Sequence, residues 1–213
     1  MRKKHLWIVG LVLAMALGIG SVVLADAKDT FTDVDESTSH YTHINALYEQ
    51  GIISGFPDGT FKPDDGLRRA DVAVMVHFAL GEPDGDVSAM TFTDVPSYAQ
   101  EAVAALSEEG VIHGYSEKTF GSNDIATRAQ VAKFLVTAFG LEMNVADQGY
   151  TDIEDDAMLS DYVNALGASG ISDGYPNGEF GVNDKVRRKD FAAFLDRAMN
   201  YDESPNPEVI GIE

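Results

Sequence analysis

The chain has 213 residues, with 15 Lys and Arg against 35 Asp and Glu, a formal net charge of −20 and no cysteine. The lack of cysteine excludes disulfides, thiolate nucleophiles and zinc sites that need sulfur ligands. The acidity argues against a nucleic-acid partner, because DNA and RNA are bound by clustered Lys and Arg.

The first 27 residues are typical of a secretory signal peptide. Basic residues at positions 2–4 precede an apolar run over 6–20, and Ala25-Asp26-Ala27 fits a small-residue cleavage site. The alternative is an uncleaved anchor, since about 19 apolar residues could nearly span a bilayer. We therefore expect a signal peptide over 1–27 and a secreted protein that has no membrane contact after cleavage.

The rest of the chain repeats one pattern three times. Each copy opens on an aromatic-Thr-Asp-aliphatic segment, continues through a glycine-containing loop and reaches an arginine 14 residues after the second loop glycine. The openings lie at 31–34, 92–95 and 150–153, the glycines are Gly55, Gly114 and Gly174, and the arginines are Arg69, Arg128 and Arg188. A period of 59 and then 60 residues indicates a repeat architecture in which each unit needs its neighbours to complete a core. The predicted repeats cover 28–86, 87–145 and 146–200, followed by an acidic tail over 201–213.

Within each copy the pattern predicts a helix, a loop and a second helix. The first helix carries apolar residues four and seven positions before a glycine that supplies a left-handed end. These pairs are Ile44 and Leu47 before Gly51, Val103 and Leu106 before Gly110, and Val163 and Leu166 before Gly170. The second helix begins near the arginine, and Thr127 with Gln130 predicts a capping box. Gly81 and Gly140 are expected to end two of the second helices.

This combination of motifs resembles the S-layer homology domain, whose repeats usually occur in threes behind a signal peptide. The resemblance covers about residues 29–200 and implies a mostly α fold. Its three tandem helix-loop-helix repeats would form a pseudo-threefold, three-prong spindle around a central three-helix bundle. The resemblance also implies non-covalent attachment to secondary cell-wall polysaccharide, often pyruvylated, or in some lineages to modified peptidoglycan.

Some positions depart from the family pattern. The threonine before the arginine is present only as Thr127, whereas Arg68 and Arg187 replace it elsewhere. A cation there opposes the helix dipole, so it suggests extra positive charge in a groove. The alternative is neutralisation by Asp64, Asp65 or Asp184. The aromatic residue usual in the first helix is Tyr98 in copy two, but Ser39 and Met158 in the others, so we expect unequal grooves.

The placement of charge favours an anion site. Nine of the twelve Lys and Arg residues after residue 27 lie within 55–71, 114–130 and 174–190. A guanidinium binds a carboxylate through two parallel hydrogen bonds, which suits a pyruvate ketal. We therefore expect glycan contacts from Arg69, Arg128 and Arg188, from Gly55, Gly114 and Gly174 beside an aromatic, and from Arg68 and Arg187. The alternative is that the first three arginines bridge to Asp33, Asp94 and Asp152, which we interpret as caps or turn formers.

The sequence gives little support for catalysis, so we expect no enzyme activity, no cofactor and no metal site. His40 and His43 could share a metal, but no third potential ligand lies at a sequence spacing typical of a zinc site. We expect a protein of the cell wall and surface layer that binds an anionic polysaccharide in inter-repeat grooves. Direct peptidoglycan binding, or a surface scaffold for other surface proteins, is the alternative, while a wall-modifying enzyme would need a deep pocket with two carboxylates.

Overall fold

A computed structural model describes residues 26–153 and 157–201 of the chain, without the side chains of 157 and 158. The predicted signal peptide up to residue 25, the acidic tail from residue 202 and the side chain of Met158 lie outside these described residues. The described part is mostly helical and has no strand, only isolated bridges. The helices are α1 (Ala27–Thr30), α2 (Tyr41–Glu49), α3 (Arg69–Ala79), η1 (Ser97–Ala99), α4 (Gln100–Glu108), α5 (Arg128–Phe139), α6 (Ala157–Ala168) and α7 (Arg188–Met199).

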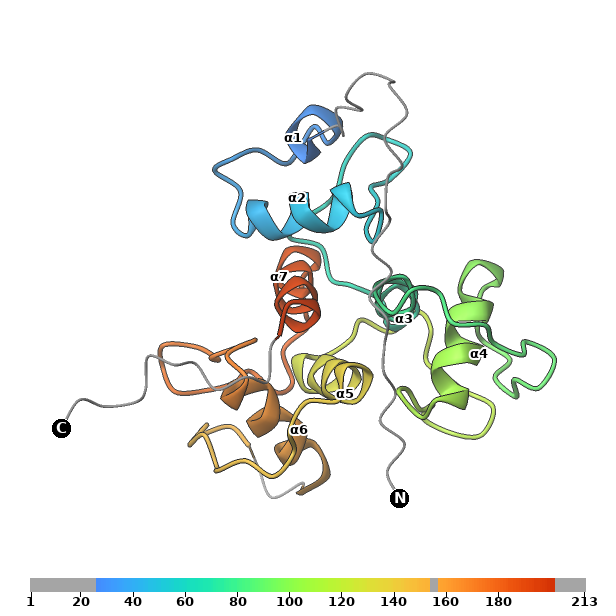
Figure 1. Ribbon diagram of the computed structural model, residues 1–213, viewed down its shortest axis with the longest axis vertical. Coiled ribbons are helices and arrows are strands. Elements are labelled where there is room, and N and C mark those ends of the chain that lie inside the picture. Colours follow the sequence, from blue (N-terminus) through green and yellow to red (C-terminus); the bar gives the residue numbers. More distant parts are fainter. Residues whose placement is uncertain (1–25, 154–156, 202–213) are drawn as a thin grey trace, which may run out of the picture.

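The three second helices, α3, α5 and α7, lie together at the centre, and α2, α4 and α6 lie outside them (Figure 1). Each outer helix packs on the central helix of the preceding repeat: α4 on α3, α6 on α5, and α2 on α7. In the described part, the Cα atoms of the outer and central helices of one repeat do not come within 8 Å of each other. This cyclic exchange is consistent with the predicted spindle, and it explains why a single repeat cannot complete a core.

A closed ring of backbone hydrogen bonds joins the segments that lead into the central helices. The Leu67 amide donates to the Val186 carbonyl at 3.0 Å, Val186 donates to Ala126 at 3.0 Å, and Ala126 donates to Leu67 at 2.9 Å. All three residues are buried. Each repeat therefore supplies one donor and one acceptor to the same ring.

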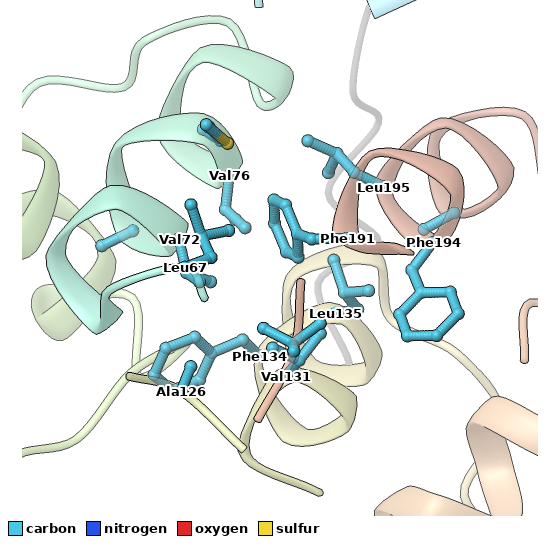
Figure 2. Packing of buried hydrophobic residues seen from close by; sticks show 14 of the residues in the cluster. Leu67, Val72, Val76, Ala126, Val131, Phe134, Leu135, Phe191, Phe194 and Leu195 are labelled. Atoms are coloured by element: carbon cyan, nitrogen blue, oxygen red, sulfur yellow. The ribbon is translucent and has the colours of Figure 1, made fainter. Parts of the chain in front are cut away.

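Apolar side chains from all three central helices meet in one core (Figure 2). The predicted apolar pairs of the outer helices are confirmed as core residues, because all six side chains are buried. The labelled contributors include Val72 and Val76 of α3, Phe134 and Leu135 of α5, and Phe191 and Leu195 of α7. Within the described residues, no helix is both long enough and apolar enough to cross a membrane.

The predicted helix ends are confirmed. Gly51, Gly110 and Gly170 have φ angles of 73°, 71° and 71°, so each adopts the left-handed conformation just after an outer helix. Both hydrogen bonds of the Thr127–Gln130 capping box are present at the start of α5. The other two central helices begin after an arginine that makes no side-chain cap.

Helix α1 was not predicted, and it places Asp26 and Ala27 inside the folded unit. Ala27 is fully buried, and its amide donates to Oδ1 of Asn45 at 2.8 Å. The Asp26 carboxylate accepts hydrogen bonds from the Lys28 amide and from the Tyr41 hydroxyl. A cut after Ala25 would leave these contacts intact, whereas a cut after Ala27 would remove them.

A chain that begins at Asp26 should therefore melt at a higher temperature than one that begins at Lys28. Loss of a helix cap and of buried hydrogen bonds should cost about 1–2 kcal/mol, or about 3–6 °C for a domain of this size. Thermal unfolding of the two chains measures the difference, with Asp26→Ala in the longer chain isolating the cap. Equal melting temperatures would show that the contacts of residues 26 and 27 contribute nothing.

Candidate functional site

Each of the three predicted arginines reaches from its own repeat into the loop of the next repeat. Nε of Arg69 donates to the Phe120 carbonyl at 3.1 Å, and Nη2 donates to the His113 carbonyl at 3.0 Å. We call this contact the first junction. The second junction joins Arg128 to the Phe180 carbonyl at 2.8 Å and the Ser172 hydroxyl at 3.1 Å, and the third joins Arg188 to the carbonyls of Phe61 at 2.7 Å and Ser54 at 3.1 Å.

Aromatic rings surround each guanidinium. The Cζ atom of Arg69 lies 4.6 Å from the ring centre of Tyr115, 4.7 Å from Phe120 and 5.2 Å from Phe134. The rings are Tyr175, Phe180 and Phe194 at the second junction, and Phe56 and Phe61 at the third. Such contacts compensate part of the lost hydration of a cation.

The three arginines are buried charges without a paired carboxylate. Arg69 is 2% exposed, and Arg128 and Arg188 are each 6% exposed. In the described part of the chain, no carboxylate oxygen lies within 4.0 Å of them, so the alternative of bridges to the opening aspartates is not observed. Burial lowers the pKa of all three guanidinium groups because it disfavours the charged form. A negative charge bound beside a guanidinium would reduce the free-energy cost of burying it.

One nitrogen of each guanidinium remains available. Nε and Nη2 are used, whereas Nη1 has no hydrogen-bond partner among the described residues. Nη1 is therefore the donor that each arginine has left for an added acceptor. Each junction thus presents a fixed cation with free donors.

The opening aspartates shape the loops that hold the arginines, in agreement with our interpretation of them as turn formers. Asp94 accepts from the amides of Phe120 at 2.8 Å, Gly121 at 2.7 Å and Ser122 at 3.2 Å. Phe120 therefore donates to Asp94 through its amide and accepts from Arg69 through its carbonyl. Asp152 accepts from three loop amides, at 2.6–2.8 Å, and Asp33 from two, at 2.7 and 2.8 Å.

The loop glycines are required by the packing of the chain itself. A Cβ atom on Gly55 would lie 2.3 Å from a ring carbon of Phe31, and one on Gly114 would lie 2.4 Å from Phe92. A Cβ atom on Gly174 would lie 2.7 Å from the Glu179 carbonyl oxygen. These contacts account for the glycines through loop shape, without a ligand.

The two extra arginines lie exposed at the starts of α3 and α7. Arg187 pairs with Asp190 at 2.8 Å and with Asp64 at 3.5 Å, so the alternative of neutralisation holds for Arg187. Arg68 has no carboxylate within 4.0 Å among the described residues. It lies beside Tyr98, whose hydroxyl donates to Asp71 at 2.8 Å, and burial together with this hydrogen bond raises the pKa of Tyr98 to about 12.

The two candidate metal-ligating histidines instead face acids across the α2–α7 interface. Nδ1 of His43 lies 2.7 Å from Asp196, and Nε2 of His40 lies 3.6 Å from Asp190. They belong to the contact that closes repeat 1 on repeat 3, and no group of three or more potential ligands occurs within the described residues.

The sequence analysis expected an aromatic residue beside each loop glycine but not its place over the arginine of the preceding repeat. Phe56, Tyr115 and Tyr175 directly follow the second loop glycine, and their rings lie at Arg188, Arg69 and Arg128. The sequence analysis missed a local difference at the second junction. Gly174 has a φ of 75°, which Gly55 and Gly114 do not share, and there a serine hydroxyl replaces the loop carbonyl as the arginine's second acceptor.

Comparison with known proteins identifies the same three repeats. The model of the S-layer homology domain matches residues 30–73, 91–132 and 149–192. S-layer protein EA1 of Bacillus anthracis is 32% identical over 185 residues, which cover 85% of this chain and 21% of that protein. A cellulosome-anchoring protein of Acetivibrio thermocellus is 29% identical over 161 residues, 70% of this chain and 35% of that protein. An endoglucanase of a Bacillus species is 28% identical over 184 residues, 80% of this chain and 19% of the enzyme.

Proposed function

The chain belongs to the S-layer homology family, a family of cell-surface proteins, and on that premise we propose that it attaches to the bacterial cell wall by binding an anionic polysaccharide at its repeat junctions. It spans only about a fifth of the length of the S-layer protein EA1. The proposal therefore concerns the attachment role of the three repeats.

The observation that carries the proposal is a buried arginine with no carboxylate partner, present three times. Each guanidinium is fixed by two acceptors of the next repeat and keeps Nη1 free. A carboxylate on a sugar, such as a pyruvate ketal, fits this donor because guanidinium–carboxylate hydrogen bonds are charge-assisted and directional. In this proposal Arg69, Arg128 and Arg188 bind the anionic group.

The other predicted site residues act around these three arginines. Gly55, Gly114 and Gly174 hold the loop shape that leaves an aromatic ring at the entrance of each junction. Arg68 and Arg187 add positive charge at the rim of the junctions, although the charge of Arg187 is partly neutralised by its ion pairs with Asp64 and Asp190. The chain as a whole is strongly acidic, so this local positive charge is what would admit an anionic polymer.

We also propose that the repeats themselves are non-catalytic. The endoglucanase relative matches most of this chain but only 19% of its own length, which is the pattern that a shared attachment module produces. A role in holding other surface proteins is a second candidate, supported by the cellulosome-anchoring relative.

Co-sedimentation with cell-wall sacculi tests the proposal. The purified protein should pellet with intact sacculi and stay in solution once acid extraction has removed the secondary polymer. The triple variant Arg69→Lys, Arg128→Lys and Arg188→Lys keeps the charge but loses the planar donor, and it should pellet at least tenfold less well. Binding that survives extraction would assign peptidoglycan as the target, and no binding to any wall preparation would overturn the proposal.

A further inference from the structure

We propose that the first junction, around Arg69, is the primary site for the anionic ligand, and that Tyr115 and Gln130 determine this preference. The inference rests on the proposed function, because it assigns the wall polymer to one of three related junctions. The junctions differ at the aromatic residue over the arginine and at the third residue of the neighbouring central helix. These two residues are Tyr115 and Gln130 at the first junction, Tyr175 and Asp190 at the second, and Phe56 and Asp71 at the third.

At the first junction the capping box fixes the direction of a hydrogen bond. Oε1 of Gln130 accepts from the Thr127 amide at 3.1 Å, so the amide group of Gln130 must turn Nε2 toward Tyr115. Nε2 then donates to the Tyr115 hydroxyl at 3.3 Å. Because the hydroxyl accepts this bond, its own hydrogen is free for an external acceptor. Tyr115 is 54% exposed and its ring contacts Arg69, so hydroxyl and guanidinium offer donors in one place.

At the second junction the equivalent hydroxyl is already used. Tyr175 donates to Oδ2 of Asp184 at 3.0 Å, so its hydrogen is engaged and a carboxylate stands beside it. Asp190 replaces the neutral Gln130 and lies close enough to Arg128 to oppose part of the effect of burial on the arginine's pKa. Asp94 and Asp124 act on Arg69 as Asp152 and Asp184 act on Arg128, but the third helix position is neutral at the first junction. Although Asp190 also pairs with Arg187, an incoming anion therefore meets one carboxylate more at the second junction than at the first.

At the third junction there is no hydroxyl, because the aromatic residue is Phe56. Asp71 stands at the position of Gln130, and its charge opposes the effect of burial on Arg188 in the same way. Lys62 adds a cation 4.1 Å from the Phe56 ring, but it pairs with Asp58 at 3.3 Å. Only the first junction combines a free hydroxyl hydrogen with a neutral side chain at the third helix position.

Two conservative variants test this assignment by binding of the purified protein to intact sacculi. Tyr115→Phe removes one donor and keeps the ring, and Gln130→Glu adds one negative charge. Glutamate also serves in a capping box, so Gln130→Glu should not lower the melting temperature. Each variant should weaken binding about tenfold, whereas the matched variant Tyr175→Phe should change it less than twofold.

The outcomes separate this inference from the proposed function. If the wild-type protein does not bind sacculi, the proposed function itself fails. If the wild-type protein binds and both Tyr115→Phe and Gln130→Glu bind equally well, the assignment to the first junction is wrong while wall attachment stands. A loss confined to Tyr175→Phe would move the primary site to the second junction and would also overturn the assignment.

Discussion

Replacing Arg128 by alanine should lower the free energy of unfolding by about 2–4 kcal/mol. The substitution leaves the Phe180 carbonyl and the Ser172 hydroxyl without their donor, at a cost of about 1–3 kcal/mol for each buried group. It also opens a cavity beside three aromatic rings, which adds to the loss. The variant no longer has to bury the charge of Arg128, which offsets part of this loss. The net change is therefore smaller than the sum of the lost hydrogen bonds and the cavity.

Urea denaturation measures this effect, with two further variants for comparison. Arg128→Lys keeps the charge but lacks the planar guanidinium that donates to both acceptors. It should therefore lose about half as much stability as Arg128→Ala. Lys118→Ala changes an exposed cation and should shift the free energy of unfolding by less than about 0.5 kcal/mol. A loss below about 1 kcal/mol for Arg128→Ala would mean that the arginine does not hold repeats 2 and 3 together.

Replacing Asp94 by asparagine should make the protein less stable at neutral pH, by about 1–3 kcal/mol, and less sensitive to acid. Burial raises the pKa of Asp94, but its three backbone hydrogen bonds together outweigh burial and bring the pKa below the usual value of 3.8. A carboxyl group whose pKa is lowered by folding stabilises the protein above its unfolded pKa, and this contribution disappears as the pH falls through the folded pKa. The stability gap between wild type and Asp94→Asn should therefore be full at pH 7 and shrink below about pH 4.

Unfolding free energies at several pH values between 7 and 2 give this comparison directly. Asp84→Asn is the matched control, because Asp84 is exposed and makes no hydrogen bond or ion pair in the described part of the chain. A gap between wild type and Asp94→Asn that stays constant down to pH 2 would show that the Asp94 charge is not what holds the loop.

The elements were predictable because their signals are local. The apolar spacing before Gly51 spans about two helical turns and the Thr127–Gln130 pair about one, so short-range sequence determines both. The packing of α4 on α3 and of α2 on α7 was not predictable, since an apolar helix face does not specify which other helix it packs against. Short elements such as α1 and η1 carry too few residues for a periodic signal.

The candidate site was predictable in its residues but not in their arrangement. Spacing and charge singled out Arg69, yet its acceptors lie 44 and 51 residues away, on a loop of another repeat. Sequence could not show that the arginine is 2% exposed, or that Asp94 binds loop amides in place of the guanidinium. Burial without a paired carboxylate, the feature that suggests an anion site, exists only once the repeats close on each other.

The most direct test of the account is the melting temperature of the protein in the presence of purified, acid-extracted wall polymer. A ligand that binds only the folded state at a hundred times its dissociation constant adds about 2.7 kcal/mol of stability. Because each junction is built from two repeats, the account predicts a rise of about 5–10 °C as the polymer saturates the protein. An unchanged melting temperature across all polymer concentrations would contradict the claim that an anionic wall polysaccharide binds at the repeat junctions.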